Sequence, residues 1–408
     1  MPGPLEGIRV VELGLWVAGP SCAAILCDWG ADVIKIEPPN GDPFRGLFAS
    51  ALGAGAQQSP PPFEADNRGK RSVALNLAND EARTIARQLL DNADVFVTNM
   101  RPRVLDDFGF DYQTLSQANP RLVYGQITGY GADGPNRDRA AYDIGAFWSR
   151  AGVASMLVPK GAPLPQQRGG MGDHMTGMSA AGAICAALLA RERSGKGQLV
   201  STSLMRVGTY MMAWDVMLAL RLKVPIEPYD REHALNPIIN CFQAGPSTGS
   251  GETGRWFWLL LLQADRHWAD LLRALGREDL QEDERFADIT IRREHAPELV
   301  AELDGVFATK SLDEWGEILD RENVWWAPVN NVNDVVNDPI SKEAGVFPEV
   351  QGADGPVPFI ATPADFSEGG AAPRGLSPEL GQHTEEVLLE LGYDWEQIIP
   401  LKEQGAIP

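Results

Sequence analysis

Short apolar runs alternate with amphipathic stretches along the first third of the chain. Five runs have the length and the β-branched or aliphatic content of strands: residues 8–13, 32–37, 72–77, 94–99 and 121–127. Between the first two, PSCAAILCDW precedes Gly30, which is typical of a helix and its stop. A second helix is expected from about residue 80 to 90, capped by Asn79. This βαβ alternation predicts an α/β fold with a parallel, doubly wound sheet.

The pattern changes after an alanine-rich helix and a further apolar segment. Residues 221–328 contain a Gly/Ser/Thr-rich tip (245–254), an aromatic strand (255–262) and charged helices. This composition predicts a smaller α+β domain. The tail, 329–408, ends in an amphipathic helix that is expected to pack against the first domain. We therefore expect a large domain from residues 1–220, completed by the tail, with the small domain between them.

Composition and charge exclude several classes of protein. The 408 residues are 44% hydrophobic, and a formal net charge of −21 opposes a broad nucleic-acid-binding surface, because phosphates require clustered basic residues. The longest apolar stretch, residues 180–190, is too short to cross a bilayer. No basic and apolar secretory signal is seen at the amino terminus, so a soluble, cytoplasmic protein is expected. The four cysteines and five histidines lack metal-ligand spacing, which predicts no metal site.

Two kinds of segment are candidates for binding a phosphate-bearing ligand. GLWVAGPS (14–21) follows the first strand, but Pro20 stands where a phosphate loop has its lysine. It is either a strand-to-helix turn or a source of backbone N–H groups at the carboxyl edge of the sheet. NRGKRS (67–72) and NMRPR (99–103) are compact basic segments, which are either solvated loops or phosphate ligands.

Asp173 is the candidate for chemistry. It lies at the start of the alanine-rich helix, where aspartate is most often an N-cap. Capping leaves the glycines at 169, 170, 172 and 177 unexplained, since these remove side chains around the carboxylate and would allow a thioester to approach. The helix N-terminus is expected to keep the carboxylate ionised. Both features suit a carboxylate nucleophile.

Ordered blocks of sequence extend this interpretation. PLEGIRVVELGLWVAGPSCAAILCDWGADVIKIEPPNGDPFR, NRGKRSVALNL, NPRLVYGQITGYGADGP, GDHMTGM, SGKGQLVSTSL, APVNNVNDVVNDP and LGQHTEEVLLELG resemble the class III CoA-transferase (CaiB/BaiF) family from about Pro4 to Leu401. The resemblance implies a Rossmann-like large domain made from both chain ends, a small domain, and an interlinked, ring-like homodimer. It also implies acyl-CoA and a carboxylic acid as substrates, with no metal or redox cofactor.

The resemblance also implies roles for particular residues. The residue matching Asp173 is the family's nucleophile, which forms a mixed anhydride and then an aspartyl-CoA thioester. The CoA contacts of the family fall on Val17, Ala18, Leu75, Asn76, Asn99, Met100, Tyr142 and Asp143. Pro38 and Asp107 stand where members often carry arginines, so Arg101, Arg103, Lys70 or Arg71 is expected to supply the positive charge for the CoA phosphates.

Two alternatives to a transferase are retained. The family includes acyl-CoA racemases, but their catalytic histidine matches Tyr142, which is a poor base near neutral pH. A catalytically silent CoA-binding partner subunit is the other alternative, and Asp173 with its glycines argues against it. LNPIIN (235–240) lacks the glycine run of oxalate-utilising members, which disfavours formyl-CoA:oxalate exchange.

Overall fold

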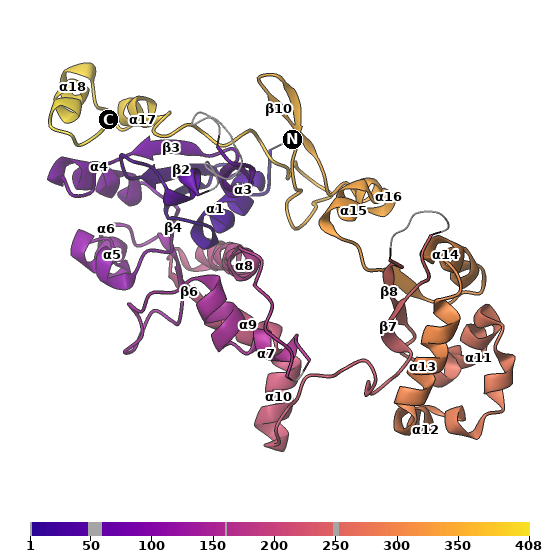
Figure 1. Ribbon diagram of the computed structural model, residues 1–408. Helices are drawn as coiled ribbons and strands as arrows, with labels where there is room; N and C mark the ends of the chain where they lie inside the picture. The colour runs from indigo at the N-terminus through magenta and orange to yellow at the C-terminus, as the bar shows by residue number, and fades with distance from the viewer. Residues whose placement is uncertain (1, 48–58, 160, 248–252) are drawn as a thin grey trace. The chain divides into compact units, whose positions relative to one another are not determined.

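The computed structural model describes residues 2–47, 59–159, 161–247 and 253–408 (Figure 1). The chain forms two compact units. The large unit comprises residues up to Ser155, Leu164–Ile226 and Lys342–Pro408, and the small unit comprises Met156–Pro163 and Glu227–Ser341. Both chain ends thus belong to the large unit. Half of the expected Gly/Ser/Thr-rich tip (245–254), residues 248–252, lies outside the described residues.

The large unit is built on a parallel sheet of six strands. Their order is β3-β2-β1-β4-β5-β6. The strands are β1 (Arg9–Leu13), β2 (Asp32–Glu37), β3 (Arg71–Ala74), β4 (Val95–Thr98), β5 (Val123–Thr128) and β6 (Leu199–Ser203). The chain order reverses between β1 and β4, which is where open α/β sheets bind ligands.

Helices cover both faces of this sheet because its central strands are apolar on both sides. Val11 of β1 lies opposite Phe96 of β4, and both join a core with α4 (Asp80–Asp91). Val10 and Val97 point to the other face, where they pack with α1 (Ala18–Asp28) and α8 (Met171–Ser194). The α/β prediction with a doubly wound parallel sheet is confirmed.

The remaining helices of the large unit are short. They are α3 (Pro61–Asn67), α5 (Pro102–Phe108), α6 (Tyr112–Ala118), α9 (Leu204–Met211), α10 (Ala213–Leu222), α17 (Thr384–Glu390) and α18 (Trp395–Glu403), with a π-helix at Ile144–Arg150 and a 3₁₀ turn at Pro43–Gly46. Two further short helices, α7 (Val153–Met156) and α16 (Pro339–Glu343), each include residues of both units. An antiparallel hairpin, β10 (Glu349–Gly352) and β11 (Gly355–Pro358), precedes α17. Among the described residues, no helix has the length and apolar content needed to cross a membrane.

The C-terminal segment completes the sheet at its β3 edge. His383 N donates to Ser72 O over 2.9 Å, and Ser72 N in turn donates to His383 Nδ1 over 3.1 Å. Ala74 N donates to Thr384 Oγ1 over 3.0 Å. The outer backbone groups of β3 are therefore satisfied by the tail, which also places α17 and α18 over the core shared with α4.

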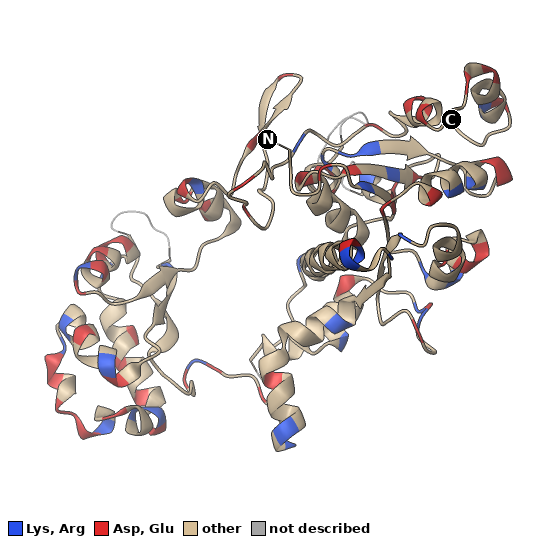
Figure 2. Ribbon diagram, turned by 180° about the vertical axis from the view of Figure 1, so that it is seen from behind, with Lys and Arg blue, Asp and Glu red and all other residues tan. Residues whose placement is uncertain are grey.

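The small unit is an α+β structure of its own. Three antiparallel strands have the order β7-β8-β9 and comprise Ile239–Gln243, Trp256–Leu260 and Trp326–Pro328. Its helices are α11 (Ala264–Leu275), α12 (Ile289–Glu294), α13 (Ala296–Phe307), α14 (Leu312–Arg321) and α15 (Val332–Asn337), with 3₁₀ turns at Glu278–Gln281 and Glu284–Phe286. Phe242, Phe257, Phe307 and Trp315 form its aromatic core. Acidic residues are spread over the helices of both units, and basic residues lie among them (Figure 2).

Candidate functional site

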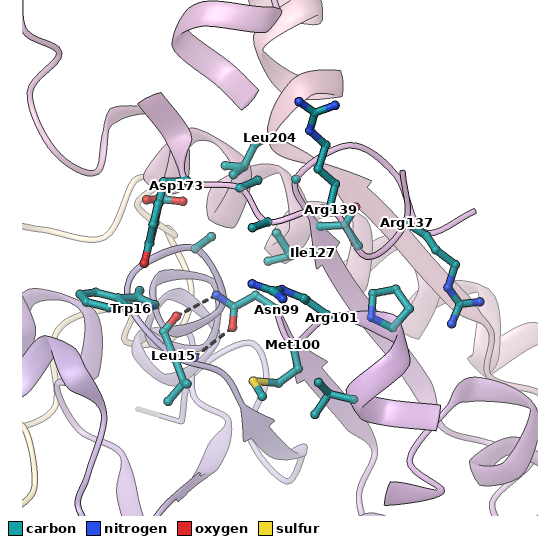
Figure 3. Close-up of a pocket in the computed structure, with 18 residues that line it drawn as sticks. Leu15, Trp16, Asn99, Met100, Arg101, Ile127, Arg137, Arg139, Asp173 and Leu204 are labelled. Carbon is teal, nitrogen blue, oxygen red and sulfur yellow. Dashed lines mark hydrogen bonds between the residues drawn. The ribbon is translucent and has the colours of Figure 1, made fainter. Parts of the chain in front are cut away.

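A cavity of about 470 Å³ opens at the carboxyl ends of β1, β4, β5 and β6. Its lining comes from the segments that follow these strands and from the first turn of α8 (Figure 3). The residues are Leu15, Trp16, Ala18, Asn99, Met100, Arg101, Pro102, Val104, Ile127, Thr128, Gly129, Arg137, Arg139, Ala140, Ala141, Tyr142, Asp173 and Leu204. The cavity therefore lies at the point where the strand order reverses.

The turn after β1 is held in place from two neighbouring segments. Asn99 binds both backbone groups of Leu15: its Oδ1 accepts from Leu15 N over 3.0 Å, and its Nδ2 donates to Leu15 O over 2.8 Å (Figure 3). Trp16 has a left-handed backbone with φ +66°, and its N–H donates to Asp42 Oδ1 over 3.1 Å. This hydrogen bond supports a conformation that costs a non-glycine residue roughly 1–2 kcal/mol. The indole of Trp16 meets Tyr142 edge to face at 5.9 Å.

Beneath this turn lies a buried network of charges. Glu12 accepts from Lys35 Nζ over 2.8 Å and from Lys70 Nζ over 2.6 Å, and none of the three side chains exposes any surface. Lys35 also binds Gly14 O at 3.0 Å and Asp42 at 3.2 Å, while Lys70 binds Pro20 O at 2.9 Å. Two ammonium groups thus hold the turn by its backbone at both ends.

Asp173 lies in the first turn of α8 but does not cap it. The N-cap is Gly170, with φ +83°, and no side chain accepts a capping hydrogen bond there. Asp173 is half-buried and lines the cavity. The alternative that Asp173 is the cap of this helix is therefore wrong, since Gly170 takes that position.

The electrostatic surroundings of Asp173 also differ from the expectation. Burial and the neighbouring charge of Asp143 raise the pKa of Asp173 to about 7, although His174 acts to lower it. Asp143 is buried and accepts from Gly172 N over 3.3 Å and from Gln167 Nε2 over 3.1 Å. The helix N-terminus alone thus does not keep Asp173 ionised, because desolvation and a second carboxylate oppose it.

The glycines around Asp173 have different causes. A Cβ on Gly172 would lie 2.5 Å from Phe147, and one on Gly177 would lie 2.2 Å from Ser21 Oγ and 2.9 Å from Ala18 O. These two glycines allow close packing within the chain, between α8 and its neighbours. Gly169 alone of the four glycines has no heavy atom within 4 Å of the position that a Cβ would take. Only at Gly169 does the structure agree with the expectation that these glycines leave open space around the carboxylate.

The structure brings together about half of the residues expected from the sequence. Ala18, Asn99, Met100, Arg101, Tyr142 and Asp173 line the cavity. Val17, Leu75, Asn76, Arg103 and Asp143 do not belong to its lining. Leu75 is buried in the large core, and Asn76 hydrogen-bonds Gly405 O and Ala406 O in the C-terminal segment.

Three of the four candidate phosphate ligands are placed elsewhere. Lys70 belongs to the buried network, so the expectation that it faces a ligand is wrong. Arg71 binds Asp32 at 2.6 Å and Glu390 at 2.7 Å. The Arg103 side chain is 80% exposed and lies 3.9 Å from Asp107. Arg101 alone of these four lines the cavity.

Arg137 and Arg139 are the site residues that sequence reasoning missed. Both lie in the segment after β5, a few residues before Tyr142, and both line the cavity (Figure 3). Arg137 pairs with Asp106 and Asp138, and the Arg139 guanidinium lies 5.4 Å from the centre of the Tyr130 ring. The available signal was the RDRAAYD run, in which two arginines precede an aligned pair of site residues.

No metal centre is seen among the residues that the structure describes. No group of three or more His, Cys, Asp or Glu side chains in that part of the chain is placed to hold a metal ion. The free cysteines Cys22 and Cys27 are buried residues of α1, and burial raises the pKa of both thiols.

Known proteins resemble this chain over almost its whole length. CoA-transferase family III matches residues 5–384. The (R)-2-hydroxy-4-methylpentanoate CoA-transferase of Clostridioides difficile is 32% identical over 404 residues, which cover 99% of each protein. The cinnamoyl-CoA:phenyllactate CoA-transferase of Clostridium sporogenes is 30% identical over 405 residues, covering 98% of this chain and 97% of that enzyme. A crystal structure of a CaiB/BaiF family protein from Brucella suis has a TM-score of 0.84 and 31% identity, covering 96% of this chain and 100% of that one.

Proposed function

The chain belongs to CoA-transferase family III, and on that premise we propose that Asp173 is the nucleophile that moves CoA from an acyl-CoA thioester to a free carboxylate. The resemblance expected from the sequence is thereby confirmed at the level of the family. One observation carries the proposal for Asp173. It is the only acidic side chain among the described residues that line the cavity.

The exchange proceeds through two kinds of covalent intermediate. A carboxylate oxygen of Asp173 attacks the thioester carbonyl and the C–S bond breaks. CoA leaves as a thiolate, and the acyl group remains bound to Asp173 as a mixed anhydride. The thiolate attacks the aspartyl carbonyl of this anhydride, which forms an aspartyl-CoA thioester and releases the donor acid as its carboxylate. An acceptor carboxylate then attacks the aspartyl-CoA thioester, which releases the CoA thiolate and forms a second mixed anhydride. The thiolate attacks the acceptor's carbonyl in this anhydride, so the new acyl-CoA leaves and the Asp173 carboxylate is regenerated. Covalent catalysis divides one difficult exchange into steps of similar energy.

The raised pKa of Asp173 suits this role. A carboxylate with a pKa of about 7 is a stronger base than an ordinary aspartate, and it is partly ionised near neutrality. The N–H of Gly172 is engaged by Asp143, so it is not available to stabilise an oxyanion. The chain's own contribution is therefore the placement of a half-buried carboxylate beside a pocket large enough for an acyl thioester.

Positive charge in the cavity supports CoA as the ligand. Arg101, Arg137 and Arg139 belong to the lining (Figure 3). Among the described residues, no carboxylate lies within ion-pair distance of Arg101 or Arg139, so both remain able to bind phosphate. Arg101 and Arg139 are therefore the proposed phosphate ligands, in place of Lys70, Arg71 and Arg103. Asn99 and Met100 form the neighbouring wall of the cavity.

A homodimer is part of the proposal. The helix α10 has no buried residue in the single chain, and its surface includes Trp214, Leu220 and Leu222. Tyr210 and Trp214 are 81% and 79% exposed. Apolar side chains at this density on one surface mark a protein interface. Light scattering on the purified protein tests this, with a monomer contradicting it.

The proposed chemistry is tested with wild type, Asp173→Ala and Asp173→Asn. Each protein is incubated with acyl-CoA donors and a panel of carboxylic acids that includes branched and aromatic 2-hydroxy acids, because the two relatives named above are called transferases of such acids. New thioesters are followed by mass spectrometry, together with hydroxylamine-sensitive adducts on Asp173. We expect exchange and adducts in the wild type only. Undiminished exchange in either variant overturns the role of Asp173, and α-proton exchange in heavy water without CoA transfer would indicate a racemase.

A further inference from the structure

A carboxylate–imidazole pair lies directly beside Asp173. His174 follows it in α8, and His174 Nε2 lies 2.9 Å from Asp66 Oδ1 in α3. Asp66 is 3% exposed, whereas the His174 side chain is 54% exposed. The pair joins the end of α3 to the first turn of α8. It is not part of the mechanism described above.

The orientation of the imidazole is fixed from a second side. A Cβ on Gly170 would lie 3.1 Å from His174 Cε1 and 3.2 Å from His174 Nδ1. The ring thus packs against the backbone of the N-cap residue, and glycine leaves the space for it. Hydrogen bonding by Asp66 and packing against Gly170 together hold His174 one residue away from the proposed nucleophile.

The surroundings of the pair are apolar. Asp66 and His174 border a second cavity of about 280 Å³, whose walls include Ile25, Met178 and Ile360. Charges interact more strongly where apolar groups exclude water. Because Asp66 is buried, its charge acts on His174 more strongly than a charge on an open surface would.

Each charged group near the pair acts on it in a known direction. The hydrogen bond that His174 donates to Asp66 raises the pKa of His174, and burial lowers it. The charges of Asp66 and Asp173 raise this pKa further, and Arg68 lowers it. Arg68 is itself paired with Asp28 at 2.6 Å. Among the groups that act on Asp173, Asp143 and Asp66 raise its pKa, and His174 lowers it.

We propose that the Asp66–His174 pair is a positioning device for the nucleophile, in which Asp66 holds a protonated imidazole at the start of α8 so that Asp173 is kept as a carboxylate. The proposal rests on the proposed function of Asp173. His174 is a positioning residue because it acts through Asp173, and no contact between His174 and the cavity that holds Asp173 is needed. Asp66 acts one step further away, through His174.

The pair predicts a specific pH dependence. The acid limb of kcat/KM reports the ionisation of the free enzyme's essential base. Loss of the positive charge at residue 174 moves this limb to higher pH. The shift expected from a charge on the residue next to Asp173 is about half a pH unit or more. Activity at pH 6 then falls about threefold more than activity at pH 8.

The experiment compares His174→Gln, His174→Arg and Asp66→Asn in the full-length protein. Steady-state kcat/KM for an acyl-CoA donor is measured from pH 5.5 to 9. We expect His174→Gln to move the acid limb upward, and His174→Arg, which keeps a cation beside Asp66, to leave it near the wild-type position. Asp66→Asn is expected to move the limb less than His174→Gln, because asparagine weakens the hold on the His174 proton but also removes a charge that raises the pKa of Asp173. His295→Gln is the matched control, because His295 is also paired with a carboxylate, Glu298, at 3.3 Å, but lies in the small unit.

A purely structural role gives a different result. It lowers kcat/KM by the same factor at every pH, and it lowers the melting temperature or CoA affinity of the variants. An acid limb that stays in place in His174→Gln while Asp173→Ala is inactive overturns this inference and leaves the proposed function intact. Full activity in Asp173→Ala instead overturns the proposed function, whatever the His174 variants do.

Discussion

Lys35 Nζ lies 2.8 Å from Glu12 Oε1, and neither side chain exposes any surface. Lys35 also pairs with the buried Asp42 at 3.2 Å, so its removal leaves Glu12 with Lys70 alone and takes the ion-pair partner from Asp42, which costs about 3–5 kcal/mol. Lys35→Met is therefore expected to lower the free energy of unfolding by about that amount. It is also expected to weaken CoA binding, because Lys35 holds Gly14 O and supports Asp42 beneath Trp16. Urea denaturation and calorimetry measure the two effects.

The control for this prediction is Lys402→Met, which breaks an exposed pair between Lys402 and Glu385. An exposed pair contributes less than about 1 kcal/mol. Equal losses for Lys35→Met and Lys402→Met would contradict a supporting role for the buried network.

Two glycines of α8 are expected to respond in opposite ways to the same substitution. Gly177→Ala places a Cβ 2.2 Å from Ser21 Oγ and 2.9 Å from Ala18 O, so α8 must move away from α1. Overpacking of this kind costs about 1–3 kcal/mol. Gly182 has no heavy atom within 4 Å of that position, and alanine there is expected to stabilise the helix by about 1 kcal/mol. Melting temperatures that change in the same direction would contradict the close packing of α1 on α8.

Arg139 is expected to bind the phosphates of CoA and not its acyl-pantetheine arm. Arg139→Ala should then weaken CoA binding about tenfold, the loss of one charge-assisted hydrogen bond. Binding of an acyl-pantetheine thioester, which lacks the nucleotide phosphates, should stay within about twofold. Arg103→Ala is the control, since its exposed side chain does not line the cavity. A larger effect of Arg103→Ala on CoA affinity would reverse the assignment.

Asp143→Asn is expected to make Asp173 a stronger acid. The charge of Asp143 raises the pKa of Asp173, after the larger effect of burial. Asparagine removes this charge and keeps an oxygen to accept from Gly172 N. The acid limb of kcat/KM should therefore move to lower pH, opposite to the shift expected for His174→Gln. A shift of both variants in the same direction would show that charge does not govern the ionisation of Asp173.

The raised pKa of Asp173 should also make the stability of the fold depend on pH. The pKa of Asp173 is raised from 3.8 to about 7, so the folded state binds more protons than the unfolded state between these values. Stability from this group consequently falls as pH rises through that window, and the penalty is complete above pH 7. Asp173→Asn removes it, so the variant should melt about 2 °C or more above the wild type at pH 8 and show no such gain at pH 4. Asp313→Asn, at a highly exposed carboxylate, should give no gain at pH 8.

Local patterns were sufficient to predict most of the sheet. Strands β1, β2, β4 and β5 coincide with apolar runs, and Asn79 caps α4 through a hydrogen bond from Glu81 N, as its position predicted. The run at 72–77 was expected to be a longer strand, but β3 ends at Ala74 because Asn76 turns toward the C-terminal segment. The helix α18 was missed, since Pro400 interrupts its pattern.

The candidate site was less predictable, and the reasons are physical. Asp173 and Tyr142 were identified because aligned motifs carry them. The charge of Lys70 appeared available for a ligand, but a sequence does not show that Glu12 lies close enough to neutralise it. Arg139 lies in a segment without periodicity, so only the fold reveals that it lines the same cavity as Asp173. Gly172 and Gly177 suggested open space around the carboxylate, whereas the close approach of Phe147 and α1 explains them.

The contact between Ser72 and His383 sets an order of events during synthesis. Strand β3 is synthesised first, and the groups that satisfy its outer edge follow 311 and 310 residues later in the chain. Until that segment emerges, the growing polypeptide carries an exposed strand edge of the kind that pairs with other chains. We expect a chain truncated before residue 383 to leave this edge unpaired and to aggregate more readily than the 408-residue chain.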